Sequence, residues 1–281
     1  MPLIKVKDIG LYYEFHGEGE PLVLLSGTGL SCENWNVFQL PDLRNHFRVL
    51  LLDYRGTGRS DKPDMHYSTR MFAEDAVDLM HVLGIDRAHV MGHSMGGRVA
   101  QWVAIDYPDS VAGLILSGTG PGTVEDGQYY QRGVPLNTMI QLIEKGLEQR
   151  LRDHFADGFM FPPEFVRDHP ETIKRLGEAN LKHPTPLRPY LRHIIARQEH
   201  ETRHLLHKIK SPTLVVCGSG DRVATGGAGD HVRSSECLAA NIAGAELVLV
   251  QGGNHSYLRQ MPEKANAIFV DFLKRHPMRK S

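Results

Sequence analysis

The sequence lacks an excess of charge of either sign. Its 281 residues include 32 Lys and Arg and 33 Asp and Glu, so the formal net charge is −1 at pH 7. A chain this close to neutrality creates no long-range field that would attract nucleic acid or an anionic membrane surface. We therefore expect neither a nucleic acid nor a membrane as a partner.

Long apolar runs and paired cysteines are also missing. No apolar stretch approaches the roughly 20 residues that span a membrane, and the first residues, MPLIKVKDIG, lack the apolar core of a signal peptide. The three cysteines, Cys32, Cys217 and Cys237, are odd in number and lack the spacing of a metal site. They indicate free thiols in a reducing compartment, so the sequence predicts a cytoplasmic protein.

Short apolar runs separated by amphipathic stretches are abundant instead. Residues 3–15 alternate between apolar and polar types, which predicts two antiparallel strands around Gly10. Later apolar runs alternate with stretches of helical periodicity such as MFAEDAVDLMHVLG (71–84). This pattern predicts an α/β fold with a mostly parallel sheet covered by helices on both faces. The predicted buried strands lie in PLVLLS, FRVLLLD, AHVMGH, VAGLILS, PTLVVCG and AELVLVQ.

The alternation stops between about residues 121 and 207. This segment holds helical patterns broken by prolines, and no strand candidate. We predict a core domain of residues 1–120 and 208–281, with a helical cap of residues 121–207 inserted after the sixth strand. The cap is expected over the carboxyl ends of the strands, where open α/β sheets bind ligands. The large side chains expected to line a pocket beneath it are Tyr129, Tyr130, Met139, Phe159, Met160 and Phe161.

One serine lies between two glycines where a strand is predicted to end and a helix to begin. In AHVMGHSMGGRVAQW (88–102), a sharp turn at Ser94 would hold this residue at φ > 0, which is costly for any residue with a Cβ. Gly92 and Gly96 would remove side chains that collide in so tight a turn. The pattern G-x-S-x-G is typical of a nucleophile elbow, and the alternative is a glycine-rich loop with an incidental serine.

A serine nucleophile needs a base that takes its proton and a third group that orients the base. The loops that follow the later predicted strands supply candidates, because such loops meet above one edge of a parallel sheet. Asp221 follows PTLVVCGSG and His255 follows ELVLVQGGN. The resulting chain order, Ser, Asp, His, is the order typical of a nucleophile on this kind of strand-to-helix turn.

Five short motifs occur in a defined order: SGTGLSCENW (26–35), DYRGTGRSDKP (53–63), GHSMGG (92–97), GSGD (218–221) and GGNHS (252–256). Together they resemble the motif series of the α/β-hydrolase fold family, over nearly the whole chain. The resemblance implies that fold and a hydrolytic enzyme, and it implies neither a cofactor nor a metal.

The resemblance also implies roles for individual residues. Ser94 would be the nucleophile, His255 the general base and acid, and Asp221 the orienting carboxylate. The backbone N–H groups of Thr28 and Met95 would form the oxyanion hole. The chain departs from the family pattern in two places. Ser26 occupies the usual position of a histidine, and a longer stretch before His255 makes Asp230 a rival acid.

These residues predict a serine hydrolase that cleaves a small, apolar carboxylic ester or lactone through an acyl-enzyme on Ser94. A carbon–carbon bond hydrolase of ring-fission diketones would use the same triad and is the main alternative. A cofactor-free oxygenase and a ligand receptor stay open as well, because one fold hosts many functions. The oligomeric state does not follow from the sequence.

Two further patterns have competing interpretations. HETRH (200–204), with His207 one turn further on, matches the zinc signature H-E-x-x-H if the segment is helical. We favour a polar helix face instead, because the chain contains 16 histidines and the pattern is short. Asp53 and Arg55 lie where a strand ends, and we expect them to form an ion pair that clamps a loop.

Overall fold

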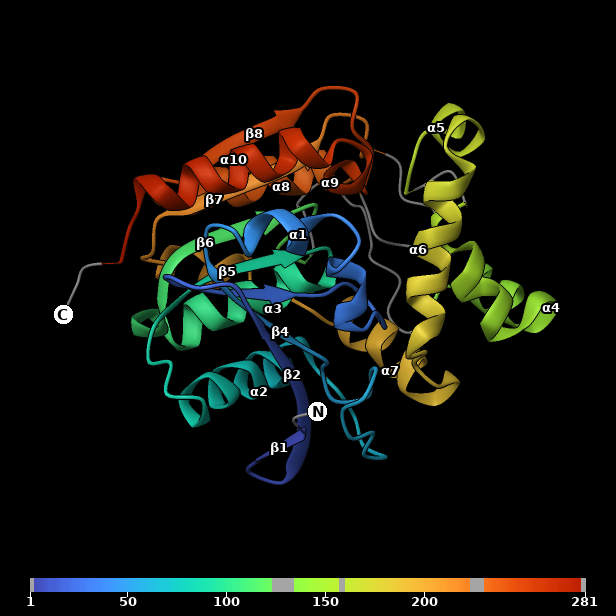
Figure 1. The fold of residues 1–281 in the computed structure, drawn as a ribbon, viewed down its shortest axis with the longest axis horizontal. Helices are drawn as coiled ribbons and strands as arrows, with labels where there is room; N and C mark the ends of the chain where they lie inside the picture. The colour runs from blue at the N-terminus through green and yellow to red at the C-terminus, as the bar shows by residue number, and fades with distance from the viewer. Residues whose placement is uncertain (1–2, 123–133, 157–159, 223–229, 279–281) are drawn as a thin grey trace.

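A single sheet runs through the molecule (Figure 1). The structure is a computed structural model that describes residues 3–122, 134–156, 160–222 and 230–278. Eight strands follow the order β1-β2-β4-β3-β5-β6-β7-β8; β2 is antiparallel to both its neighbours and all other pairs are parallel. The predicted mostly parallel sheet is therefore confirmed. The strands are β1 (Leu3–Val6), β2 (Ile9–His16), β3 (Pro21–Leu25), β4 (Arg48–Leu52), β5 (Ala88–His93), β6 (Val111–Ser117), β7 (Thr213–Gly218) and β8 (Glu246–Val250).

The first hairpin turns earlier than predicted. Lys7 and Asp8 form the turn, with Lys7 at a left-handed φ of 51°, whereas Gly10 lies inside β2 and pairs with Lys5. The Gly10 N–H donates to the carboxylate of Asp61 at 2.7 Å, and a Cβ on Gly10 would lie 2.9 Å from the same oxygen. Glycine therefore serves here to let a neighbouring loop approach the strand.

Alternate residues of the central strands are buried on opposite faces of the sheet. In β3, Leu22 and Leu24 pack on one side, and Val23 and Leu25 pack on the other. Helices must cover both faces, since both are apolar, and Figure 1 shows α10 on one side and α2 and α3 on the other. None of the described helices is long and apolar enough to cross a bilayer. The helices packed on the sheet are α1 (Gln39–Leu43), α9 (Tyr257–Gln260) and α10 (Pro262–Arg275) on one face, and α2 (Thr69–Val82), α3 (Met95–Asp106) and α8 (His231–Asn241) on the other.

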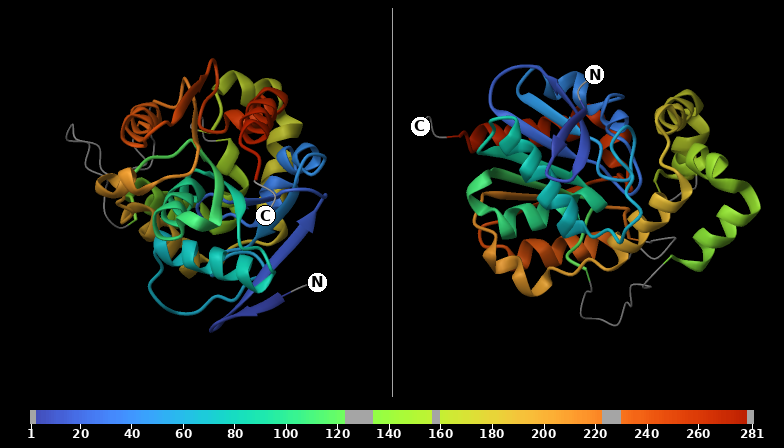
Figure 2. Two further views of the ribbon diagram at one scale, coloured as in Figure 1. Left: turned by 90° about the vertical axis from the view of Figure 1, so that its left-hand side faces the viewer. Right: turned by 90° about the horizontal axis from the view of Figure 1, so that it is seen from below.

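The described residues between β6 and β7 form helices and no strand. In Figure 1 these helices gather beside the sheet, at the end toward which the arrowheads of β5 and β8 point, and the right-hand view of Figure 2 shows them projecting from the same end. They enclose two small apolar clusters, one containing Tyr190 and Ile194 and one containing Phe155, Phe161 and Leu176. The helices are α4 (Leu136–Arg152), α5 (Pro163–Asp168), α6 (Pro170–Lys182) and α7 (Leu187–Gln198), with the 3₁₀ turn η3 (Asp153–Phe155).

The end of this segment packs against the sheet's own helices. After α7 ends at Gln198, the 3₁₀ turn η4 (Arg203–Lys208) lies against α3 and α8. Leu206 is fully buried in the same apolar cluster as Val23 and Leu25 of β3. The chain therefore passes from the helices beside the sheet to the elements packed on the sheet close to residue 200.

Candidate active site

Ser94 lies at the junction of β5 and α3, in the strained conformation that the sequence predicts. Its φ is 58° and its ψ is −120°; Lys7 and Ser94 are the described non-glycine residues with positive φ. A Cβ on Gly92 would lie 2.1 Å from the carbonyl oxygen of Gly96, and a Cβ on Gly96 would lie 2.0 Å from that of Leu25. Both glycines are therefore required by backbone contacts, and the glycine-rich loop with an incidental serine does not describe this turn.

The structure brings Ser94, His255 and Asp221 together from three different loops. Asp221 follows β7, and His255 lies in the loop between β8 and α9. His255 Nδ1 lies 2.8 Å from Asp221 Oδ2, and His255 Nε2 lies 3.1 Å from Ser94 Oγ. With the proton on Nδ1, the imidazole donates to the carboxylate and its Nε2 is the acceptor for the Ser94 hydroxyl.

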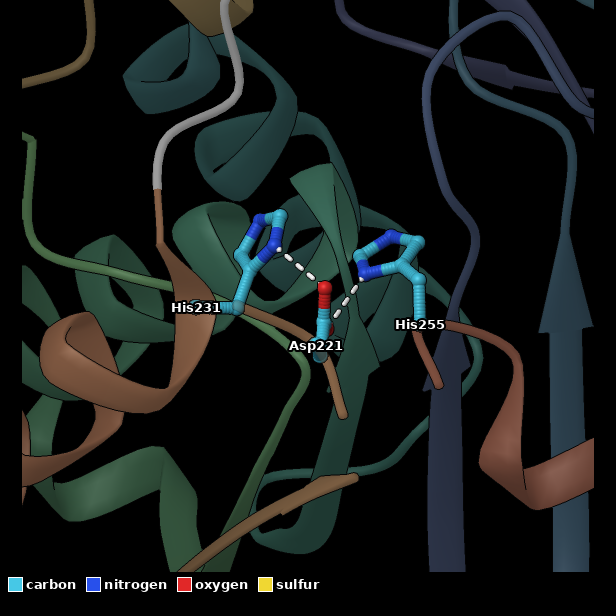
Figure 3. A group of neighbouring side chains, drawn as sticks. All are labelled: Asp221, His231 and His255. Carbon is cyan, nitrogen blue, oxygen red and sulfur yellow. Dashed lines mark hydrogen bonds and ion pairs between the residues drawn. The ribbon is translucent and has the colours of Figure 1, made fainter. Parts of the chain in front are cut away.

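A second imidazole, which the sequence analysis missed, binds the same carboxylate. His231, the first residue of α8, lies with its Nδ1 3.0 Å from Asp221 Oδ1 and is 3% exposed. Figure 3 shows Asp221 between the rings of His231 and His255, each bonded to the carboxylate. No sequence motif connects these residues, because the bond depends on how α8 packs beside β7.

Asp230, which the sequence offered as a rival to Asp221 for the orienting acid, caps a helix in the structure. It is the N-cap of α8, and its carboxylate accepts a hydrogen bond from the Arg233 N–H at 3.0 Å. This bond satisfies one of the free N–H groups in the first turn of the helix. Asp230 thus holds the start of α8, and the adjacent His231 reaches the predicted triad.

The two imidazoles keep Asp221 ionised. Burial alone would raise the pKa of this carboxyl, but the charges and hydrogen bonds of His231 and His255 outweigh burial and bring the pKa of Asp221 well below its usual value. Burial also lowers the pKa of His231, although Asp221 opposes that shift. At neutral pH a carboxylate therefore faces neutral His231, whose Nδ1–H is held toward the carboxylate.

The two predicted oxyanion-hole residues come from different parts of the chain. Met95 is the first residue of α3, and Thr28 lies in the loop after β3. Among the described residues, neither backbone N–H has a hydrogen-bond acceptor. Ser26, which stands in place of a histidine, is 2% exposed and its Oγ is unpartnered within the same set of residues.

Asp53 and Arg55 do not form the predicted ion pair with each other. The carboxylate of Asp53 accepts from the Cys32 N–H at 2.7 Å and pairs with Arg59 at 3.2 Å, whereas Arg55 makes two bonds of 2.6 Å to Asp75 on α2. The predicted pairing was wrong because Asp53 pairs with Arg59 of its own loop, whereas Arg55 reaches Asp75 on α2. Asp53 nevertheless anchors the loop that carries Thr28, since Cys32 lies four residues further along it.

The zinc pattern HETRH is not helical. α7 ends at Gln198 and η4 begins at Arg203, so His200 and His204 do not share a helix face. His200 is 5% exposed and lies 2.9 Å from Thr69 Oγ1. Both the zinc helix and the polar helix face were wrong here, because His200 packs into the core and bonds to α2.

A different set of residues has potential ligand atoms close together. One atom each of Asp221, His231 and His255 lie within 4.8 Å of one another. The separations of 2.8 and 3.0 Å between the imidazoles and the carboxylate are those of N–H···O bonds, and each ring addresses its own oxygen. One N–H proton on each imidazole therefore accounts for this arrangement. Removal of metal with a chelator tests the alternative, a metal ion bound by these three side chains.

A small cavity of about 40 Å³ adjoins Ser94 and His255. An open space this small admits a few water molecules, so a substrate with a carbon skeleton requires neighbouring side chains to move. We call it the Ser94 cavity. The described residues that line it are Gly27, Thr28, Leu30, His93, Ser94, His154, Phe155, Met160, Arg197, His255 and Arg259.

The predicted lining of this cavity is supported at one position and corrected at two. Met160 lines it, but Met139 is exposed on α4 and Phe161 is buried in the cluster with Phe155. Tyr129, Tyr130 and Phe159 lie outside the described residues. The cavity is also not purely apolar, because two arginines, Arg197 and Arg259, contribute to its wall.

A larger hollow of about 730 Å³ lies elsewhere, between α1 and α10. Its lining includes Phe38, His46, Asn266 and Asp271, and it shares no residue with the Ser94 cavity. The described residues that line it include no hydroxyl or thiol nucleophile beside a base. Size alone therefore does not make it a reaction site.

Comparison with known families agrees with this geometry. The family model described as the alpha/beta hydrolase fold matches residues 20–258. A protein of Caulobacter sp. (strain K31), named carbamate hydrolase RutD, is 30% identical over 275 residues, which cover 94% of this chain and 96% of the relative. The match therefore extends over nearly the whole of both proteins.

Solved structures provide two further similarities. The enol-lactonase from Burkholderia xenovorans LB400 superposes with a TM-score of 0.81 at 25% identity, covering 97% of this chain and all of that chain. A thermophilic esterase from Thermogutta terrifontis superposes with a TM-score of 0.79 at 25% identity, covering 96% and 95% of the two chains. Both similarities include the helices between β6 and β7 in the aligned length.

Proposed function

Because the chain belongs to the α/β-hydrolase fold family and is an enzyme of the hydrolase class, we propose that it is a serine hydrolase with Ser94 as its nucleophile. In this proposal His255 is the general base and acid, and Asp221 orients it. The observation that carries the proposal is the continuous hydrogen-bond chain of 3.1 and 2.8 Å from Ser94 through His255 to Asp221. That chain ends on a carboxylate which stays ionised.

The proposed reaction proceeds in two half-reactions. Ser94 Oγ attacks the substrate carbonyl carbon while His255 Nε2 takes the hydroxyl proton, and the Thr28 and Met95 N–H groups donate to the resulting oxyanion. When the tetrahedral intermediate collapses, the imidazolium protonates the leaving oxygen and an acyl-enzyme forms. A water molecule, deprotonated by the same imidazole, then releases the acid and restores the Ser94 hydroxyl.

We propose a small carboxylic ester or lactone as the substrate. The names of the similar enol-lactonase and esterase support this class, because lactones and esters present the same acyl–oxygen bond to a serine nucleophile. The small open space beside Ser94 supports a compact molecule, because such a molecule requires the least movement of neighbouring side chains. We do not expect this ester or lactone to be apolar, since Arg197 and Arg259 line the cavity.

A carbamate is the second candidate substrate. The name of the Caulobacter relative supports it, and a carbamate carbonyl is attacked by the same hydroxyl with the same base. The carbon–carbon bond hydrolase uses the same three side chains and stays a prediction that the screen below tests. No cofactor is part of any of these reactions.

The experiment is a substrate screen with the purified protein and its Ser94→Ala variant. We expect the protein to hydrolyse p-nitrophenyl acetate or butyrate, and a burst of p-nitrophenol appears if the acyl-enzyme accumulates. Carboxylic lactones, carbamates and ring-fission diketones form the other arms. Hydrolysis of one class that is abolished in the variant supports the proposal, whereas equal activity of both proteins contradicts it.

Two controls separate this mechanism from its rivals. EDTA or 1,10-phenanthroline should leave activity and Tm unchanged; stoichiometric metal that is lost together with activity would instead assign Asp221, His231 and His255 to a metal site. Activity that requires dioxygen would indicate the oxygenase.

We also propose that residues 121–207 form a cap over the cavity. The support is that His154, Phe155, Met160 and Arg197 all line it.

The cytoplasmic location stays a prediction, which the three free cysteines support.

A further inference from the structure

Arg259 is a buried cation in the wall of the Ser94 cavity. It belongs to the short helix α9, which follows His255 directly, and its side chain is 3% exposed. The same small cavity is lined by Ser94, His255 and Arg259. A group bound to this guanidinium would therefore be close to a carbonyl that Ser94 attacks.

The other two buried arginines of the described residues have acceptors. Arg55 makes a bidentate ion pair with Asp75, and Arg98 donates to the backbone oxygen of Arg197. Arg259 has neither an ion pair nor a side-chain hydrogen bond within the described structure, and its Nε is buried without an acceptor. Its contact there is with the ring of Phe155, whose centroid is 5.3 Å from the guanidinium carbon.

Burial of the Arg259 guanidinium without an acceptor is unfavourable unless a ligand provides one. A buried charge without a partner destabilises the folded protein, because the guanidinium loses its hydration and gains no acceptor in return. Arginine is moreover the side chain best suited to a bidentate contact with a carboxylate. The missing partner of Arg259 is therefore expected to be an anion that enters the cavity.

The charges around the cavity agree with an anionic occupant. Burial lowers the pKa of Arg259 to about 10, so the guanidinium keeps its charge at neutral pH. Desolvation, followed by the charges of Arg150 and Arg259, lowers the pKa of His154 to about 3. No carboxylate side chain is among the described residues that line the cavity. Asp221 lies behind His255 and is engaged by two imidazoles.

We propose that the substrate of the Ser94 site is a small ester or lactone that carries a free carboxylate, and that Arg259 binds this carboxylate. The inference rests on the proposed function, since it names the substrate class of the same site. Because Ser94 and Arg259 line the same cavity, we expect the carboxylate and the reacting carbonyl to be separated by only a few bonds. Arg259 is then a specificity-determining residue, which positions the carbonyl over Ser94.

Three matched methyl esters test the charge directly. Monomethyl succinate carries a carboxylate, methyl succinamate replaces it with an amide of the same shape, and methyl butyrate replaces it with a methyl group. We expect kcat/KM for monomethyl succinate to exceed that for methyl succinamate by about 10- to 100-fold, the range for a hydrogen-bonded ion pair. Release of acid is followed in a pH-stat.

Variants of Arg259 assign the preference to this residue. Arg259→Gln should abolish the preference mainly through a higher KM for monomethyl succinate, and Arg259→Lys should retain part of it. Arg275→Gln, which removes an exposed arginine far along α10, is the charge-matched control and should leave the preference unchanged. Because Arg259 makes no ion pair or side-chain hydrogen bond within the described residues, Arg259→Gln should lower the Tm of the free protein far less than Arg55→Gln does.

Binding to the Ser94→Ala variant separates this inference from the proposed function. Calorimetry should show tighter binding of monomethyl succinate than of methyl succinamate, and the difference should vanish in Ser94→Ala/Arg259→Gln. If all three esters are hydrolysed equally well, or if Arg259→Gln leaves the ratio unchanged, the carboxylate proposal is overturned and the serine hydrolase stands. If no ester is hydrolysed but the anionic ester binds preferentially, the proposed reaction fails and the anion site stands. Absence of both hydrolysis and preferential binding overturns both.

Discussion

The floor and the roof of the Ser94 cavity are held in place by different interactions. The floor comes from loops at the strand ends, where groups are positioned by backbone geometry and buried hydrogen bonds. The roof comes from the segment between β6 and β7, whose helices pack through two small apolar clusters. The floor consists of Gly27, Thr28, Leu30, His93, Ser94, His255 and Arg259, and the roof of His154, Phe155, Met160 and Arg197.

The two kinds of interaction suit different tasks. Acyl transfer requires reacting groups held within a fraction of an ångström, and directional bonds at strand ends supply that precision. Apolar packing is non-directional and tolerates changes of shape, so it suits the selection of substrates by size. We infer that the floor performs the chemistry, that the roof limits substrate size, and that Arg259 adds a preference for charge from the floor. The predictions below test this division, in order of expected effect.

Removal of a reacting group from the floor should have the largest effect. Ser94→Ala or His255→Ala is expected to lower kcat by about 10⁴- to 10⁶-fold, because nucleophile and base act as one unit. Ester hydrolysis measures the loss, and circular dichroism checks that the fold is unchanged. A loss of less than tenfold in a folded variant would show that the floor does not act through these residues.

The orienting acid should come next, and Asp230 provides its control. Asp221→Asn is expected to lower kcat by about 10³- to 10⁴-fold, since an amide can favour the wrong imidazole tautomer. Asp230→Asn should be nearly silent, because asparagine caps a helix as well as aspartate does. A large loss at Asp230 with little loss at Asp221 would reverse the assignment of the acid.

Acid should destabilise the core below neutral pH. Burial, as the largest cause, lowers the pKa of His89, His93, His193, His200 and His231, and that of His193 to about 4. Below the unfolded pKa of about 6.5, the unfolded chain binds protons that the folded chain excludes, so the free energy of unfolding is highest above that pH. It should fall between about pH 6.5 and pH 4, by up to about 1.4 kcal/mol per histidine and pH unit. A Tm that stays constant or rises from pH 7 to pH 5 would contradict this sign.

Two neighbouring residues of the segment between β6 and β7, one in an apolar cluster and one in the roof, should separate packing from substrate selection. Phe161 is fully buried and stacks on Phe165, with ring centroids 4.7 Å apart, so Phe161→Ala should cost about 3–5 kcal/mol of stability. Met160 lines the cavity, and Met160→Ala should mainly change KM across a series of ester chain lengths, by up to about tenfold. Neither variant should move the pH profile of kcat, and a moved profile with unchanged selectivity would refute the division between floor and roof.

His231 should have the smallest effect on activity. His231→Leu removes a donor to Asp221, and we expect kcat to fall about tenfold with an altered pH profile, because Asp221 loses a hydrogen bond that keeps it ionised. His231→Asn retains an N–H donor near the position of Nδ1 and should restore most of the activity. Equal losses in both variants would mean that His231 contributes only packing.

Local signals in the sequence were sufficient wherever neighbouring residues dictate the conformation. The glycines at 92 and 96 predict the strained turn at Ser94, because the collisions that they avoid arise within the turn and with the adjacent strand. Apolar runs predicted a mostly parallel sheet, since a strand covered on both faces must be apolar throughout. The order of Ser94, Asp221 and His255 then indicated which loops meet, as parallel strands end at one edge.

The partners of the buried charges could not be predicted from the sequence, because they depend on how distant segments pack in the tertiary structure. Asp53 pairs with Arg59, Arg55 with Asp75, and His231 binds Asp221. The strength of such contacts depends on distance and burial in space, and neither follows from separation along the chain. For the same reason the sequence predicted an apolar pocket, whereas the packing of α9 places Arg259 in the cavity wall with no ion pair or side-chain hydrogen bond to the residues that the structure describes.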